Sequence, residues 1–436
     1  MPAPDPGTSR AAPSDWLLLA LIAALPLMKP PLSYPLVLPD ILFLMLAAAV
    51  GFDLLLRRRR IEWAQANWVL LAYAVGLAPS LLASGDVASS LTKLAGSLYL
   101  VTLAGLTALL INSEAKLRRA ILVWLGTTAA MGLLAPLSVA AFALSSGSGL
   151  LDYTSYGFGS LPPGNYPRLA LTFINANMMC NYLTVSLGLL LAAKRCEWIA
   201  RAPFNLLLAG ILFAALTSLS PGLGGIALLA GLWAWLTERK SAPMIAKWGL
   251  AAGIGLALLF AVALAVTPVI YPAAPFVVRV PLTDAILVPS GRFLTWTSAA
   301  GEFLRHPLIG HGIGIDAAAV TYPRPDGFVE QLTDAHNLFL SIGAQAGLAG
   351  LAGLGAVIAL AVRLTGRLHL DERRGSALRL ALGLSFLDAF VYQGLGGSFE
   401  DTRHLWVLLG LLIAAGRLKF TRPDGNSHRP GGPLPG

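Results

Sequence analysis

The chain has 436 residues, of which 56% are hydrophobic and 12% are charged, and its mean hydropathy is +0.70. Soluble globular domains carry about 25% charged residues, so this composition excludes a soluble two-domain protein. Repeated apolar runs of about 17–25 residues indicate helical spans, whereas a transmembrane β-barrel would alternate polar and apolar residues. The net charge of +9 is explained by Lys and Arg in cytoplasmic loops, so it does not by itself indicate a nucleic-acid partner.

Hydropathy therefore predicts an all-α polytopic membrane protein with about twelve transmembrane helices. The first apolar run is short, but another span follows at once, so we interpret it as an uncleaved first helix. The spans are expected at residues 15–29, 36–56, 66–84, 90–111, 120–145, 171–193, 203–219, 222–237, 247–267, 336–362, 376–396 and 403–417.

This pattern predicts four parts of the chain. Residues 1–267 would hold nine spans with an outer loop at 146–170, and residues 268–335 would form one large outer loop containing amphipathic helices. Residues 336–417 would hold three more spans. Residues 418–436 are rich in Pro and Gly and are expected to be a disordered cytoplasmic tail.

The distribution of positive charge predicts the orientation. With the N-terminus inside, most of the 31 Lys and Arg residues lie in inner segments. Cytoplasmic loops are enriched in these residues, so both termini are expected in the cytoplasm and the large loop outside. The outer side keeps only Lys29, Lys93, Arg168, Arg279, Arg292, Arg305, Arg324 and Arg403.

Arg292 begins a predicted amphipathic helix in the large loop. Ser290 suits the N-cap, and Phe293, Trp296 and Phe303 follow at helical spacing. A helix dipole disfavours a cation in the first turn, so an anion held at this helix start would explain the placement. The alternative is an ordinary surface Arg whose aliphatic stem packs on apolar neighbours.

Arg168 lies at the expected outer mouth of the sixth span, and Asn175 and Asn177 are expected about two turns deeper. Asn side chains in an apolar helix often hold helices together, which is the simpler interpretation. Two arginines at one membrane surface suit a diphosphate, since guanidinium groups bind phosphate oxygens in paired hydrogen bonds. Arg279, in the same large loop as Arg292, is a candidate third contact.

His336 begins the predicted tenth span. Thr333 or Asp334 can cap that helix, which would place His336 in its first turn. The positive helix end would keep the imidazole neutral and able to accept a proton, as a general base must. A structural, hydrogen-bonding histidine is the alternative.

Other site chemistries find little support. No HExxH, DxD or Cys/His cluster with ligand spacing is present in the sequence, so no metal site is predicted, and His306 and His311 look like turn residues. The glycines of Gly310 to Gly314 follow no strand and precede no Lys-Ser or Lys-Thr, which disfavours a nucleotide loop. Asp388 is the one clearly deep carboxylate, which is thin support for a proton-coupled transporter.

Taken together, three pieces of the sequence resemble the O-antigen ligase family, part of the wider group of bacterial O-antigen ligases and polymerases. They are Arg168 with TFINANMMCNYL, then SGRFLTW followed by FLRHPLIGHGIG, and then DAHNLFLSIGAQAGLAGL. The resemblance covers about residues 153–354. Many relatives carry Ser-Arg-Gly where this chain has Ser220-Pro221-Gly222, so the role of that family arginine is not carried over.

The resemblance implies a GT-C-type glycosyltransferase at the periplasmic face of the bacterial inner membrane. The donor would be O-antigen polysaccharide on undecaprenyl diphosphate, the acceptor a sugar hydroxyl of lipid A core, and the partners otherwise membrane lipids. Neither a metal nor another cofactor is expected, and no nucleic acid.

The hypothesis is an inverting transfer in which Arg168 and Arg292, with Arg279, bind the diphosphate. Asn177 would line the site, His336 would accept the acceptor's proton, and Asp334 and Asn337 would position His336.

Three alternative functions remain open. An O-antigen polymerase would use the same donor with a second lipid-linked chain as acceptor. Polymerases tend to have two large outer loops, and here the 146–170 loop is much shorter than the 268–335 loop. The others are an oligosaccharyltransferase that glycosylates protein, and a transporter, which would need midplane charges and paired broken helices.

Overall fold

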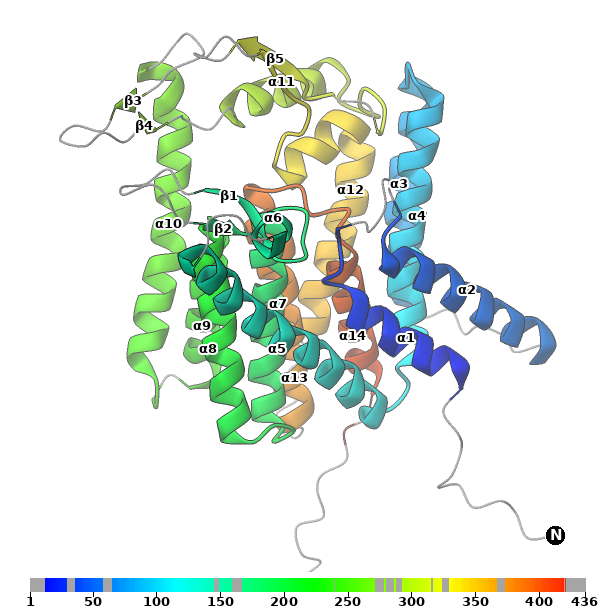
Figure 1. Ribbon diagram of the computed structural model, residues 1–436. Helices are drawn as coiled ribbons and strands as arrows, with labels where there is room; N and C mark the ends of the chain where they lie inside the picture. The colour runs from blue at the N-terminus through cyan, green and yellow to red at the C-terminus, as the bar shows by residue number, and fades with distance from the viewer. Residues whose placement is uncertain are drawn as a thin grey trace, which may run out of the picture.

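The computed structural model describes residues 12–29, 36–57, 65–144, 149–158, 167–238, 240–270, 278–279, 286–287, 292–314, 317–323, 329–366, 373–418 and 420. Within these residues the chain is mostly helical (Figure 1). The helices up to the large loop are α1 (Pro13–Ala24), α2 (Leu38–Arg57), α3 (Gln65–Leu77), η1 (Ala78–Ala83), α4 (Val87–Leu110), α5 (Glu114–Leu144), α6 (Gly149–Thr154), α7 (Ala176–Arg195), α8 (Arg201–Ser218), α9 (Leu223–Thr237) and α10 (Pro243–Ile270). The later ones are α11 (Arg292–Arg305), α12 (Leu338–Gly366), α13 (Arg373–Phe386), the π-helical η2 (Leu387–Tyr392), η3 (Gln393–Leu395) and α14 (Arg403–Arg417).

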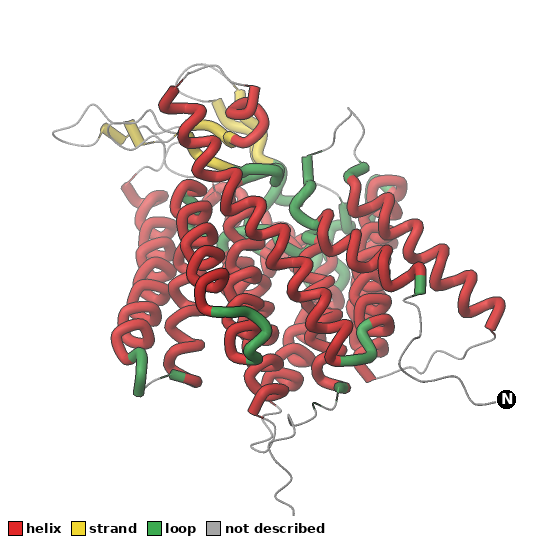
Figure 2. The backbone as a smooth tube through the Cα atoms, turned by 60° about the horizontal axis from the view of Figure 1, so that its bottom comes forward, coloured by secondary structure: helices red, strands yellow, loops and turns green. Residues whose placement is uncertain are grey.

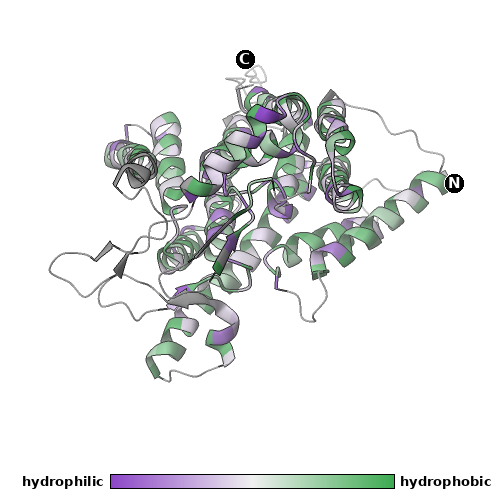
Figure 3. Ribbon diagram, turned by 90° about the horizontal axis from the view of Figure 1, so that it is seen from above, coloured by the Kyte–Doolittle hydropathy of each residue, from purple (hydrophilic) through white to green (hydrophobic). Residues whose placement is uncertain are grey.

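Eight helices in the described part of the chain are long and apolar enough to cross a membrane. The other four predicted spans correspond to the shorter apolar helices α1 and α9, to α10, whose apolar stretch is described from Pro243 to Leu259, and to the 15-residue α14. The outward faces of the helices carry exposed leucines such as Leu82 and Leu144, and Figure 3 shows apolar residues along these helices. Helices satisfy their backbone groups internally and can therefore present apolar side chains to lipid. The polytopic helical class is confirmed.

Three short antiparallel strand pairs accompany the helices. They are β1 (Ser155–Phe158) with β2 (Pro167–Leu169), β3 (Val278–Arg279) with β4 (Ile286–Leu287), and β5 (Val320–Pro323) with β6 (Val329–Leu332). All three fall in the predicted outer loops. Loop backbone outside a helix still needs hydrogen-bond partners, and short strand pairs supply them. Figures 1 and 2 show β3, β4 and β5 together with α11 at one end of the bundle.

Helix α7 forms the centre of the bundle and packs against α5, α8, α9 and α13. Its Tyr182 stacks on Trp124 of α5 with ring centroids 5.2 Å apart, and both side chains are fully buried. Small residues allow close helix contact elsewhere. A Cβ on Gly231 of α9 would lie 2.4 Å from the backbone nitrogen of Leu250 in α10, so only glycine allows this approach.

The glycine-rich loop after α11 docks into a break in α12. Gly347 interrupts that helix with φ 61° and ψ −154°, and the amides of Leu348 and Ala349 donate to the carbonyls of Pro307 and Leu308, at 2.8 and 3.1 Å. Gly310 also has a positive φ, and a Cβ there would lie 2.3 Å from the backbone of α12. The glycines predicted not to bind nucleotide therefore serve to fix α11 against α12.

Candidate functional site

Arg168 is held by three elements at the outer end of α7 and α8. It lies half-buried in β2, where its Nε donates to the carbonyl of Ser218 at 3.0 Å and its Nη2 donates to Oδ1 of Asn177 at 3.2 Å. Ser220 donates its hydroxyl to the same Asn177 oxygen at 2.9 Å. These bonds fix the guanidinium at the start of α7. The sequence pattern did not indicate Ser220, because it lies in the turn where the expected family motif changes.

The start of α7 differs from the prediction. Asn175 is the N-cap residue and accepts a hydrogen bond from the amide of Met178, and Asn177 lies in the first turn. The two amides are therefore at the helix end rather than two turns inside the span. The apolar run begins at residue 171, but residues 171–175 form a turn after β2, since the chain must reverse there to join strand to helix.

Arg292 is the first residue of α11, as predicted, and is half-buried. Ser290, the predicted cap, lies outside the described residues. Burial lowers the pKa of Arg292, the positive charge of Arg168 lowers it further, and the carboxylate of Asp334 opposes both effects. Arg168, Arg292 and Asp334 therefore lie close enough for their charges to interact, although they are far apart in sequence.

His336 lies outside α12, which corrects the predicted placement in the first turn. Its backbone is left-handed, with φ 47°. Asn337 caps the helix instead of Thr333 or Asp334, because its Oδ1 accepts from the amides of Phe339 and Leu340 at 3.0 and 3.1 Å. The expected influence of the positive helix end on His336 is therefore replaced by a direct carboxylate contact.

That carboxylate is Asp334. One of its oxygens lies 3.1 Å from Nδ1 of His336, and the other accepts from the His336 amide at 2.9 Å and from the Ser398 hydroxyl at 2.6 Å. Burial alone would raise the pKa of Asp334, but the hydrogen bonds from His336 and Ser398 outweigh it and lower the pKa to about 2. An ionised Asp334 draws the imidazole proton to Nδ1, which leaves the lone pair of Nε2 as an acceptor.

Two further hydrogen bonds hold the residues on either side of His336 in place. Trp296 of α11 donates its indole N–H to the carbonyl of Ala335 at 2.8 Å, and Asn337 donates to the carbonyl of Leu395 at 3.1 Å. The His336 side chain itself remains 46% exposed, so a substrate can reach it. Non-glycine residues in the left-handed region are strained and occur preferentially at functional sites.

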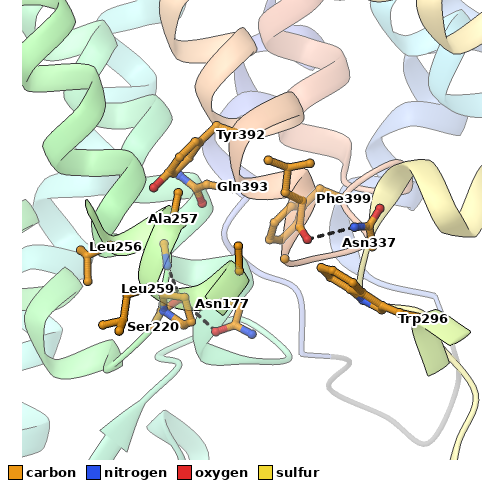
Figure 4. Close-up of a pocket in the computed structure, with 15 residues that line it drawn as sticks. Asn177, Ser220, Leu256, Ala257, Leu259, Trp296, Asn337, Tyr392, Gln393 and Phe399 are labelled. Carbon is orange, nitrogen blue, oxygen red and sulfur yellow. Dashed lines mark hydrogen bonds between the residues drawn. The ribbon is translucent and has the colours of Figure 1, made fainter. Parts of the chain in front are cut away.

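A cavity of about 550 Å³ is lined by Asn177, which bonds Arg168, and by Asn337, which follows His336. Figure 4 shows Asn177 and Ser220 on one side, Trp296, Asn337 and Phe399 on another, and Leu256, Ala257 and Leu259 along α10. Most of its lining is apolar. A cavity of this size and character can bind a hydrocarbon chain with a polar head at the arginine side.

A buried polar network lies behind this cavity and was not predicted. Gln393 donates to Thr184 at 2.8 Å and to Asp388 at 3.2 Å, and Asn181 donates to Gln393 at 3.1 Å and bonds His404 at 2.8 Å. The deep carboxylate noted in the sequence thus has a partner in Gln393, which also lines the cavity. Asp388 lies in the π-helical η2, a helix form common at functional sites, and its side chain is buried.

Arg279 and the two histidines after α11 are the remaining residues that the sequence singled out. Arg279 lies in β3, and its side chain is outside the described part of the structure. His306 and His311 come together with Glu302 so that one ligand atom from each lies within 4.8 Å of the others, a set that can hold a metal ion. The sequence spacing did not predict this set, because one ligand comes from α11 and two come from the turn that follows α11 and folds back beside it. Arg305 forms an ion pair with the same Glu302.

Comparison with known protein families bears on this site directly. Residues 203–355, from α8 into α12, match the family model described as O-antigen ligase. The resemblance to that family is confirmed. The matched stretch contains Arg292 and His336, whereas Arg168 precedes it. The comparison with curated proteins gave no match. The family match supports a function of the O-antigen ligase or polymerase type, with lipid-linked polysaccharide as substrate in a membrane.

Proposed function

We propose that the protein is an O-antigen ligase of the GT-C type, which transfers O-antigen polysaccharide from undecaprenyl diphosphate to a sugar hydroxyl of lipid A core. The observation that carries this proposal is that the charges of Arg168 and Asp334 both act on Arg292, while Asp334 contacts His336. Asn177 and Asn337, which bond Arg168 and follow His336 respectively, both line the apolar cavity. The site would face the periplasm of the inner membrane, with both chain termini in the cytoplasm.

The two arginines would bind the donor. Guanidinium groups pair well with phosphate oxygens, and Arg168 is already oriented by Ser218 and Asn177. When the bond between the anomeric carbon and the diphosphate breaks, its electron pair goes to the leaving oxygen, and the arginines stabilise the resulting charge. The polyprenyl chain would lie along α10 in the apolar cavity, where Leu256 and Leu259 line the wall.

His336 would serve as the general base. Its Nε2 accepts the proton of the acceptor hydroxyl while that oxygen attacks the anomeric carbon from the opposite side, and configuration is inverted. Asp334 holds the ring and stabilises the imidazolium that forms. The proton then passes from His336 to solvent. No carboxylate acts as nucleophile, so a covalent glycosyl-enzyme is not expected, and the mechanism uses no metal.

The test mixes the purified protein with lipid-linked O-antigen and lipid A core and follows ligation on a gel. His336→Ala is expected to abolish transfer while donor binding persists, and Arg168→Ala or Arg292→Ala to weaken donor binding. His306→Ala and Arg305→Ala, exposed residues at the end of α11, are the matched controls. Transfer by His336→Ala at the parent rate would rule out the base, and intact donor binding by both arginine variants would rule out the clamp.

The same assay separates the related functions. Donor incubated without lipid A core would be lengthened by a polymerase and left unchanged by a ligase. Transfer to a protein acceptor would indicate an oligosaccharyltransferase. Movement of substrate into vesicles without any transfer would indicate a transporter instead.

A further inference from the structure

A second cavity of about 250 Å³ lies beside Asp334, and it shares no lining residue with the apolar cavity in the described part of the chain. Its wall is polar, in contrast to the larger cavity. It forms where α4, the start of α12 and the segment before α14 meet. The residues lining it are Lys93, Gly314, Ala317, Ala318, Thr333, Asp334, Ala335, Ser341, Ala344, Gln345, Ser398, Glu400 and Asp401.

Glu400 gives the clearest sign that this cavity binds a ligand. Its side chain is 3% exposed, and Oε1 accepts from the Ser341 hydroxyl at 3.0 Å. Its other oxygen, Oε2, is buried and has no hydrogen-bond partner among the described residues. Buried polar atoms in proteins nearly always have a partner, and a hydroxyl bound in the cavity would supply one here.

The protonation of Glu400 fits such a contact. Burial and the neighbouring Asp401 raise the pKa of Glu400 and Lys93 lowers it, and the net pKa is about 8. At neutral pH the carboxyl group is therefore largely protonated and can donate as well as accept. A protonated carboxyl and a sugar hydroxyl are both donors and acceptors, so each satisfies the other.

The other polar residues of the cavity wall also offer hydrogen-bond donors and acceptors. Gln345 donates to Ser341 at 2.9 Å and accepts from the amide of Gly314 at 3.0 Å, which fixes the amide group in one orientation. Lys93 forms an ion pair with Asp401 across the wall. The cavity is smaller than the 300–1,000 Å³ typical of drug-sized ligands, and its size suits one sugar ring.

Two other ligand classes fit poorly. A phosphate group would meet the carboxylates of Asp334 and Asp401 against the single cation Lys93, so like charges would repel it. A divalent cation would have to compete with Lys93, which already neutralises Asp401. Neutral hydroxyl groups meet neither difficulty.

Asp334 connects the cavity to the reacting site. The same carboxylate that lines the cavity lies 3.1 Å from Nδ1 of His336. We propose, on the basis of the function proposed above, that this cavity binds one polyhydroxylated sugar ring of the acceptor, with Glu400, Ser341 and Gln345 as its contacts. The ring held there presents its neighbouring hydroxyl to His336, while the donor occupies the arginine side.

The test measures the acceptor KM and the donor KM separately, in Glu400→Leu and Ser341→Ala, each of which removes the hydrogen-bonding group. Loss of one hydrogen bond of this kind is expected to raise the acceptor KM about tenfold and to leave the donor KM within about twofold. Glu238→Leu, at an exposed carboxylate that follows α9 and lies outside both cavities, is the matched control and should change neither. An unchanged acceptor KM in both cavity variants would overturn the assignment while leaving the ligase function standing.

A binding experiment keeps the test independent of turnover. Delipidated core oligosaccharide is added to the protein in lipid nanodiscs, and contact is followed by saturation-transfer NMR. The parent and Glu238→Leu should show contact, and Glu400→Leu and Ser341→Ala should lose most of it. Absence of contact in the parent, or equal contact in all four proteins, would overturn the proposal. Absence of ligation by the parent, with this contact pattern intact, would refute the function and keep the sugar site.

Discussion

Replacing Asp334 by Asn tests the pairing on which the proposed base depends. The substitution keeps the size of the side chain but removes the charge that holds the Nδ1 proton of His336, at 3.1 Å. An amide can present its N–H to Nδ1 instead, which favours the wrong tautomer and leaves Nε2 protonated. The imidazolium formed during the reaction also loses its anionic partner.

The magnitude follows from the exposure of the pair. General-base catalysis contributes about 10²–10⁴-fold to a rate, and burial strengthens such a pair while solvent weakens it. The side chains of His336 and Asp334 are 46% and 42% exposed, so we expect the low end, a fall in kcat of about 10²-fold. By transition-state arithmetic this corresponds to about 2.7 kcal/mol.

The assay is the pH profile of kcat, measured with saturating donor and acceptor. In Asp334→Asn kcat should be lower at every pH measured, because the imidazolium formed during the reaction is no longer stabilised by a carboxylate. Asp86→Asn is the control, since Asp86 caps α4 through the amide of Ser89 and Asn caps helices equally well. A kcat within twofold of the parent at every pH would refute the base assignment.

Further variants test the arginines, the polar cavity and the buried polar network. Arg168→Ala and Arg292→Ala should each weaken donor binding by about tenfold or more. The double variant should lose less binding free energy than the sum of the two single losses, because both residues contact one diphosphate. Equilibrium binding of labelled donor measures these losses. Glu400→Gln should make the unfolding midpoint less dependent on pH. Folding raises the pKa of Glu400 from its ordinary value of about 4.5 to about 8, so the folded protein loses stability as the pH rises between these two values. Gln does not titrate and therefore removes that loss. Gly225→Ala should destabilise the bundle by about 1–3 kcal/mol, since its Cβ would lie 2.3 Å from the Gln393 amide nitrogen; thermal unfolding in detergent measures the change.

Each of these has its own contradicting outcome. Additive losses in the double arginine variant would mean that the two residues bind separate groups. A midpoint in Glu400→Gln that follows pH as the parent does would assign the pH dependence elsewhere. Gly355→Ala in α12 is the control, because a Cβ there meets nothing within 4 Å. Gly225→Ala with the same stability as this control would mean that the buried network adjusts without a cost in free energy.

The sequence alone determined the membrane class and the local elements, because hydropathy and helical periodicity depend on neighbouring residues. It predicted the amphipathic helix of residues 292–305 at the bounds that the structure has, and it selected Arg168, Arg292 and His336 as the candidates of interest. Those residues were conspicuous because an outer loop of a membrane protein holds few cations and histidines. The prediction of the helix start at His336 was wrong, because Asp334 and Asn337 suit the N-cap equally well by residue type.

Only the tertiary structure decided how these pieces meet. Asn337 became the cap and released Asp334 to hold His336, a choice fixed by contacts with Ser398 and Leu395 from a distant loop. The strand pairs and the two cavities likewise arise between segments far apart in the chain. Local patterns carry no information on such contacts, since each depends on which distant helix packs alongside. The polar cavity beside Asp334 is the clearest example. In the sequence its residues Glu400 and Asp401 only indicate a short turn before the last helix.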